Sequence, residues 1–239
     1  MFKTIFYQPM LNILVMMYNI FHDLGFSVIA LITLVRLILW PFFTKSETSQ
    51  KVIAKIQPEV ARIQKENGKD YQAQSKELLA LYKRYKINPS FTMLFSIIQI
   101  FFILALFNVF NIISKPTFVN YLYSFLKHIT SVNYIAFGSI NLIEKSILLA
   151  VLAALTQVIQ GWLMIRNTGP KDPQRGTLII ITLVMPLVLL SLYNKLPSII
   201  FLYWTILTLI GIIQTTYIQK HFKMPSEEPE IISQDKLTS

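Results

Sequence analysis

Long apolar runs alternate with short polar segments along most of this chain. Five runs are long enough, or nearly so, to cross a bilayer as helices, which needs about 20 apolar residues. They cover residues 24–43, 91–113, 141–165, 177–194 and 198–219. The fourth is short and contains Pro186, which predicts a kink or tilt. The pattern predicts an all-α polytopic membrane protein whose five-helix core is formed by 24–43 and 91–219.

The polar segment 44–90 separates the first two runs and has a helical period of its own. Ile53, Ile56, Val60 and Ile63 recur at spacings of three and four, and so do most of Tyr71, Leu78, Tyr82 and Tyr85. Asn67-Gly68 supplies a turn between the two seams, and Pro58 divides the first arm. We expect a helical hairpin here and a polar, disordered tail over 220–239.

The first 23 residues carry their polar side chains on one narrow stripe of a helix. Thr4, Gln8, Asn12, Asn19, His22 and Asp23 form that stripe. This pattern favours an amphipathic helix lying in the membrane interface. A sixth span and a cleaved signal peptide are the alternatives, although Gln8, Pro9 and Asn12 interrupt the apolar stretch that a signal peptide needs.

The loop charges predict an orientation for the whole bundle. If 44–90 is cytoplasmic, sixteen Lys and Arg lie inside, counting the loop 166–176 and the tail. Only five lysines, at 3, 115, 127, 145 and 195, lie outside. Positive charge concentrates on the cytoplasmic side of membrane proteins, so the hairpin and the C-terminus are expected there. The same rule explains the net charge of +10 without a nucleic-acid partner.

Arg36 is the one charged residue in the centre of an apolar run. Burying a charge at that depth costs about 3 kcal/mol even on permissive scales. The central parts of the other runs contain no Asp or Glu that could serve as an obvious partner within the chain. We expect the guanidinium to face an aqueous cavity open to the cytoplasm and to be solvated by water or a transient anionic guest. The alternative is that it snorkels or bonds to neighbouring carbonyl groups.

The remaining polar groups in the runs are amides and one nearby hydroxyl. Thr33 lies one turn from Arg36, and the amides include Gln99, Gln157, Gln160 and Gln214. Taken singly, each amide is expected to hydrogen-bond a neighbouring helix. Together with Arg36 they could line a polar groove, with Gln99 and Gln160 as the favoured members. Tyr203 and Trp204 are most simply packing residues.

The sequence lacks the residues that several kinds of functional site require. There is no Cys, and His22, His128 and His221 are scattered, so no metal site, cofactor site or catalytic site is predicted. No carboxylate or His relay for proton coupling, no protease constellation and no nucleotide motif lies in the runs.

The ordered series of motifs resembles the YidC-type membrane protein insertases, relatives of the mitochondrial oxidase-assembly and chloroplast thylakoid insertases. The matching stretches are LITLVRLILWPFF, IQPEVARIQKENGKDYQAQSKELLALYKRYKINPS, LFSIIQIFFILALF, Asp172-Pro173, Met185-Pro186 and LPSIIFLYWTILTLIGIIQ.

The resemblance implies a non-enzymatic protein that moves segments from the cytoplasm into a bacterial inner membrane. Arg36 would be the groove cation, Gln99 and Gln160 lining residues, and Tyr203 and Trp204 part of the region that contacts a passing segment. Nascent membrane proteins and lipids would be its partners, and the ribosome and a Sec-type translocon are left open. A solute or ion transporter and a non-catalytic assembly scaffold are the alternative functions.

Overall fold

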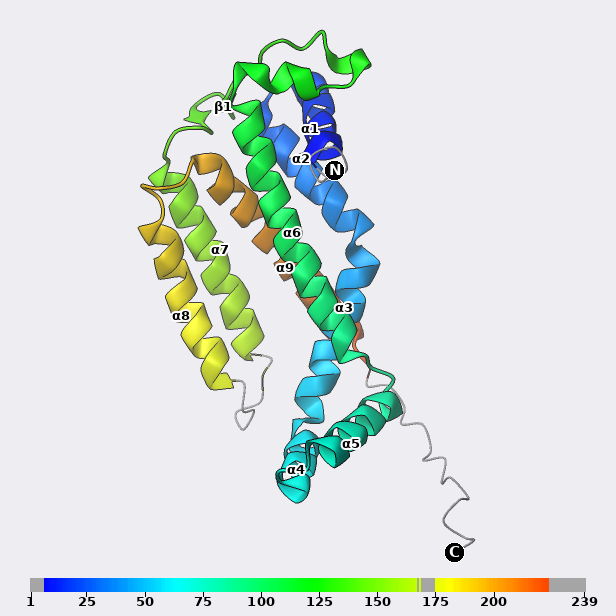
Figure 1. Cartoon of the computed structure of the whole chain (residues 1–239). Helices are drawn as coiled ribbons and strands as arrows, with labels where there is room; N and C mark the ends of the chain where they lie inside the picture. The colour runs from blue at the N-terminus through cyan, green and yellow to red at the C-terminus, as the bar shows by residue number, and fades with distance from the viewer. Residues whose placement is uncertain (1–6, 167, 169–174, 224–239) are drawn as a thin grey trace, which may run out of the picture. The chain divides into compact units, whose positions relative to one another are not determined.

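The computed structural model describes residues 7–166, 168 and 175–223, and within α6 (Pro89–Ile113) it describes only part of the side chains. The chain is mostly helical (Figure 1). It divides into two compact units, one formed by Met1–Pro41 with Ile98–Thr216 and the other by Phe42–Ile97 with Tyr217–Ser239. Three helices (α3, α6 and α9) pass from one unit into the other.

The first unit contains the apolar helices. These are α1 (Gln8–Phe21), α2 (Leu24–Ile38), most of α6, α7 (Ile147–Arg166), α8 (Arg175–Ser191) and most of α9 (Ser198–His221). Two short 3-10 helices, η2 (Pro116–Tyr121) and η3 (Ser124–Leu126), follow α6. A small antiparallel hairpin of β1 (Ile135–Ala136) and β2 (Ile140–Asn141) precedes α7, with Ile135 opposite Asn141 and Ala136 opposite Ile140.

Two of these helices, α7 and α9, are long and apolar enough to span a membrane, among the described residues. A third span is reached if α2 and α3 (Trp40–Lys55) are counted as one broken span. The apolar segment Ile100–Ile113 of α6 and helix α8 are shorter. The first unit therefore has the length and composition of a membrane-embedded helical bundle.

The predicted span 24–43 is not one continuous helix. Helix α2 ends at Ile38, Leu39 caps it through a bond from its N–H to the Val35 carbonyl at 3.0 Å, and α3 begins at Trp40. Pro41 explains the break, because it has no N–H to donate to the carbonyl four residues earlier and its ring disfavours helical geometry just before it. The break places Arg36 in the last turn of α2.

The predicted span 141–165 also begins too early. Asn141 ends β2, residues 142–146 form a loop with a bend, and α7 starts only at Ile147. The apolar character of Leu142 reflects burial inside the loop, where its carbonyl accepts a bond of 2.9 Å from the Ile199 N–H. Ser198 donates in the same way to the Glu144 carbonyl at 2.8 Å. This segment therefore caps the start of α9 instead of continuing α7.

Helix α1 forms within the predicted N-terminal segment, but its polar stripe is not uniformly exposed. Asn12 is buried, donates to the Tyr121 carbonyl at 3.0 Å and accepts from the Tyr123 N–H at 2.7 Å. By contrast, Ile20 and Phe21 are exposed. The stripe thus partly serves to join α1 to the η2 and η3 segment, while Thr4 lies outside the described residues.

The second unit contains α3, α4 (Gln57–Asn67) and α5 (Tyr71–Arg84), with α4 packed against α5. Its buried cluster contains the predicted seam residues Ile56, Val60, Ile63 and Tyr85 together with Val52, Leu81 and Ile87. The seam residues Ile53, Leu78 and Tyr82 are partly buried and pack against this cluster. Gly68 follows α4 with a φ of 53°, a conformation that glycine adopts without steric cost. Tyr71 was expected in the seam but is 75% exposed, because it is the first residue of α5 and lies beyond the packed stretch.

The predicted tail begins inside a helix. Helix α9 extends to His221, so residues 220 and 221 are helical, and 224–239 lie outside the described residues.

Candidate functional site

Arg36 is buried near the C-terminal end of an apolar helix. Its residue exposure is 6%, and it is the one basic residue in the last turn of α2. The carbonyl groups at the end of a helix carry partial negative charge, so a cation there is stabilised by roughly 0.3–1 kcal/mol or more. The helix break at Leu39 therefore supplies part of the electrostatic compensation that Arg36 needs.

A hydrogen bond joins Arg36 to the last apolar helix. The Arg36 Nη1 donates to Gln214 Oε1 at 3.2 Å, across 178 positions in the chain. Gln214 is only 2% exposed. The expectation that the cation has no partner within the chain is corrected, since a neutral amide on α9 takes that role where a carboxylate was sought. Bonding of this kind to a carbonyl oxygen was the alternative that the sequence left open.

The amide nitrogen of Gln214 has a different environment. Its Nε2 is buried and makes no hydrogen bond to any group in the described part of the chain. A buried unsatisfied donor costs about 1–3 kcal/mol. The Gln214 side chain therefore accepts a hydrogen bond from Arg36 through Oε1, and its Nε2 donor stays available beside the guanidinium.

Tyr203 lies on the same side of α9 as Gln214. The two residues are eleven positions apart, about three helical turns, so their side chains share a face. Tyr203 is 4% exposed. The structure thus brings Arg36 and Gln214 into one buried polar cluster between α2 and α9, whereas Tyr203 lies about three turns away on the same face of α9.

A second polar contact joins α9 to α7. Trp204 Nε1 donates to Gln157 Oε1 at 3.3 Å, and the Thr208 hydroxyl donates to the same oxygen at 3.5 Å. Trp204 and Thr208 are one turn apart, so both lie on the same face of α9 and bond the same Gln157 oxygen. This contact matches the simpler expectation that an amide in a membrane helix bonds a neighbouring helix.

Gln160 contacts the same helix three positions further along α7. A Cβ atom added to Gly211 would lie 2.8 Å from Gln160 Nε2. Gly211 is buried, so the glycine makes room for the amide side chain between the two helices. Gln157 and Gln160 thus both lie along the packing surface between α7 and α9.

The other two predicted groove residues contribute less to this picture. The Thr33 hydroxyl donates to the Ile29 carbonyl of its own helix at 2.8 Å, a common way for a helical Thr to satisfy its polar group. The Gln99 side chain lies outside the described part of α6.

The groups that are brought together are a guanidinium, three amides and one hydroxyl. Within the described ranges, no three His, Asp or Glu side chains are close enough to hold a metal ion. Gln214 is the residue that sequence reasoning undervalued. Its signal was the eleven-residue spacing from Tyr203, which puts both on one face of the last apolar run.

Fold and site together define a helical membrane protein with a buried cationic cluster. Residues 16–227 match the family described as "60Kd inner membrane protein", and the chain belongs to this family. The family and the apolar helices indicate a bacterial inner membrane protein.

Three relatives and one solved structure define the similarity further. The chain is 32% identical to "Membrane protein insertase YidC" of Clostridium tetani over 83% of each protein. It is 28% identical to "Membrane protein insertase YidC 1" of Streptococcus pyogenes serotype M6, covering 90% of the chain and 73% of the relative. A Syntrophobacter fumaroxidans YidC is 25% identical over 91% of the chain, which spans only 38% of that relative.

The fold is similar to the crystal structure titled "Active YidC insertase crystal structure with the first transmembrane domain resolved". The TM-score is 0.58 with 22% identity, covering 90% of the chain and 46% of the other structure. At this identity the likeness concerns the fold. The chain therefore shares the helical arrangement of that structure and spans less than half of its length.

Proposed function

We propose that this protein is a membrane protein insertase, which moves hydrophobic segments and short polar tails from the cytoplasm into the bilayer. The observation that carries the proposal is the buried Arg36, bonded to a neutral amide among apolar helices that contain no Asp or Glu. The curated relatives named as insertases support the same function.

In the proposed topology, five spans form the core. They are α2 with the start of α3, then α6, α7, α8 and α9. The segment 44–90 and the tail 220–239 are cytoplasmic, and 1–23 lies in the outer interface. The count of sixteen basic residues inside against five outside supports this orientation.

Arg36 acts on the translocated part of a client in this proposal. A polar backbone without hydrogen-bond partners costs several kcal/mol in hydrocarbon, so a hydrated groove in the inner half of the membrane lowers the barrier to crossing. Because Arg36 is almost fully covered in the closed arrangement, water and client must first separate α2 from α9. An acidic tail then replaces Gln214 as the acceptor of the guanidinium.

The remaining predicted site residues would line the opened groove. Gln157 and Gln160 line it from α7, Trp204 and Tyr203 from α9, Thr33 from α2 and Gln99 from α6. When α7 and α9 separate, the Gln157 amide loses its hydrogen bonds with Trp204 and Thr208 and bonds water or the client backbone instead. This role uses groups that are satisfied in the closed state, so opening costs hydrogen bonds that the client replaces.

The pair of helices α4 and α5 receives nascent membrane proteins and contacts anionic lipid with its basic surface. Hydrophobic burial then drives the client into the bilayer, without covalent chemistry by this chain. The ribosome and a Sec-type translocon are further candidate partners, and no direct nucleic-acid contact is proposed.

The test is insertion by the purified protein in liposomes during cell-free synthesis of a single-span client with an acidic N-terminal tail. Protection of the tail from protease measures insertion. Arg36→Glu is expected to reduce protection at least tenfold for the acidic tail and far less for a neutral tail of equal length. Arg166→Glu is the control, because it reverses an exposed charge at the end of α7.

Equal insertion by wild type and Arg36→Glu would remove Arg36 from the mechanism. No insertion by wild type, together with copurification of membrane complex subunits, would favour an assembly scaffold. Uptake of a defined solute into the same liposomes would favour a transporter.

A further inference from the structure

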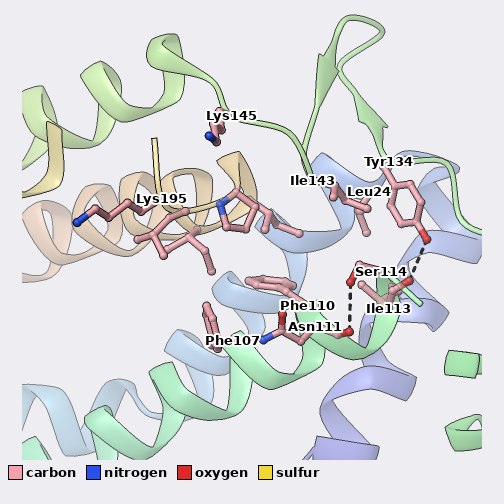
Figure 2. A pocket seen from close by; sticks show the side chains of 14 residues that line it. Leu24, Phe107, Phe110, Asn111, Ile113, Ser114, Tyr134, Ile143, Lys145 and Lys195 are labelled. Atoms are coloured by element: carbon pink, nitrogen blue, oxygen red, sulfur yellow. Dashed lines mark hydrogen bonds between the residues drawn. The ribbon is translucent and has the colours of Figure 1, made fainter. Parts of the chain in front are cut away.

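A pocket of about 270 Å³ lies where three helix ends meet in the first unit. Its walls come from the last two turns of α6, the first residue of α2, the first turn of α9 and the segments just before α7 and α9. Figure 2 shows Phe107, Phe110 and Asn111 from α6 on one side, and the loop residues Lys145 and Lys195 away from them. The pocket is separate from the Arg36 cluster, since it shares none of its residues.

The lining has two chemical parts. Most of the wall is apolar, with Phe110, Ile113 and Ile199 buried within it. Lys145 and Lys195 add two exposed ammonium groups from different segments of the chain, and no Asp or Glu lines the pocket. An apolar hollow with two cations at its rim is complementary to an amphiphile that carries negative charge.

Glu144 directly precedes the pocket residue Lys145 in the sequence, but its side chain bonds another residue. The Glu144 Oε1 accepts a hydrogen bond from Asn141 Nδ2 at 2.8 Å, and Glu144 does not line the pocket. The two lysines therefore meet no carboxylate in the lining, so their charge is available to a ligand.

The polar side chains of the lining are arranged around the end of α6. Tyr134 donates its hydroxyl proton to the Ile113 carbonyl at 3.0 Å, and Ser114 donates to the Asn111 carbonyl at 3.1 Å (Figure 2). These bonds hold the tyrosine ring against the helix end. The exposed Asn111 amide is a further donor for an ester or phosphate oxygen.

Because few lysines lie on this side of the membrane, the presence of two of them in one pocket lining is informative. In the proposed topology only five lysines lie outside, and two of the five line this one pocket. That side also places the pocket at the level where the helices end and lipid headgroups begin.

We propose that the pocket binds an anionic phospholipid of the outer leaflet, with its phosphate between Lys145 and Lys195 and the upper part of one acyl chain against the apolar wall. The volume holds only part of a lipid, so the rest of the chain continues into the bilayer. A soluble phosphate would use the lysines and leave the apolar wall uncovered, which is why the lipid is the better fit.

The test is native mass spectrometry of the full-length, delipidated protein titrated with phosphatidylglycerol or phosphatidylcholine. We expect tighter binding of phosphatidylglycerol, weakened about tenfold or more in Lys145→Gln/Lys195→Gln. The matched control is Lys115→Gln/Lys127→Gln, which removes the same charge from lysines outside the pocket lining and is expected to leave the affinity unchanged. Ile200→Trp, which fills the apolar wall, is expected to weaken binding with all charges intact.

Equal losses in the two double variants would overturn the proposal, because the effect would then be general attraction to charge. Displacement of the lipid by glycerol 3-phosphate, or no effect of Ile200→Trp, would assign the pocket to a soluble phosphate instead. The titration contains no client, so its result stands apart from the outcome of the insertion assay. The assignment of the pocket to the outer leaflet rests on the proposed topology, whereas lipid binding measured in detergent does not depend on it.

Discussion

Arg36 of α2 donates a hydrogen bond to Gln214 of α9 across 178 positions of the chain, at 3.2 Å. The same helix α9 contacts Gln157 and Gln160 of α7 through Trp204, Thr208 and Gly211 on an adjacent face. One helix thus holds polar contacts to two neighbours inside an apolar bundle. Opening on either side of α9 would expose amides and a cation to whatever enters.

Gln214→Leu is expected to destabilise the protein. The buried guanidinium of Arg36 would lose an acceptor, which costs about 1–3 kcal/mol for a buried group and more when it is charged. The midpoint of thermal unfolding in detergent should fall. Gln219→Leu, near the end of the same helix, is the control, and an equal effect there would show that helix composition and not the bond is responsible.

Gln214→Glu separates stability from function. A carboxylate in place of the amide pairs with Arg36, so the midpoint of thermal unfolding should stay above that of Gln214→Leu. Insertion of clients with acidic tails should nevertheless fall, since the internal carboxylate competes for the guanidinium. Normal insertion by Gln214→Glu would contradict displacement of Gln214 by the client.

Gly161 of α7 allows close packing against α8. A Cβ atom at this position would collide with the Thr182 side chain. Gly161→Ala is therefore expected to push the two helices apart at a cost of about 1–3 kcal/mol. Thermal unfolding measures the cost, and a second substitution, Thr182→Ala, should recover part of it because it removes two of the colliding atoms.

Gly176→Ala is the matched control for that substitution. The glycine lies at the start of α8 and a Cβ atom there meets nothing within 4 Å. Since Ala favours helix over Gly by about 1 kcal/mol, Gly176→Ala should be neutral or stabilising. Equal destabilisation by both variants would contradict the packing argument.

The helical class and the cation could be predicted from the sequence, because long apolar runs and one charge within them are strong signals. The partner of Arg36 could not, since Gln214 became its neighbour only through packing of the first and last apolar runs. Hydropathy likewise could not distinguish Leu142, which is buried in the loop before α7, from the first turn of that helix. The break at Leu39 was signalled by Pro41, although the apolar run continues through it.

Asp23 joins α2 to the small β-hairpin. Its Oδ1 accepts from the Phe26 N–H at 3.0 Å and caps the helix, while Oδ2 accepts from the Phe137 N–H at 2.7 Å. Asp23→Ala removes both bonds and should cost roughly 1–2 kcal/mol. Hydrogen exchange should accelerate at the Phe137 amide as well as in the first turn of α2.

Asp70→Ala is the control for Asp23. The Asp70 side chain accepts bonds from the Gln72 and Ala73 N–H groups, both in α5, and so caps that helix alone. It should accelerate exchange only at the start of α5. Unchanged exchange at Phe137 in Asp23→Ala would contradict the bridging role.

The pH dependence of the second unit should depend on Lys51. Burial lowers the pKa of Lys51 from 10.5, Glu47 opposes this effect and Lys55 adds to it. Between the lowered pKa and 10.5 the folded state holds fewer protons than the unfolded state, so stability rises with pH in that window. Below the lowered pKa the cost of burying the charge is fully present.

Lys51→Met should remove this dependence, because the methionine side chain carries no charge. The Lys51 ammonium group lies 5.6 Å from the centre of the Phe222 ring, so the substituted side chain still packs against an aromatic group. Thermal unfolding measured from pH 7 to pH 10 should show a smaller rise with pH than the wild type. Lys83→Met, at an exposed position of α5, is the control and should keep the wild-type slope, whereas an unchanged slope in Lys51→Met would assign the pH dependence to other groups.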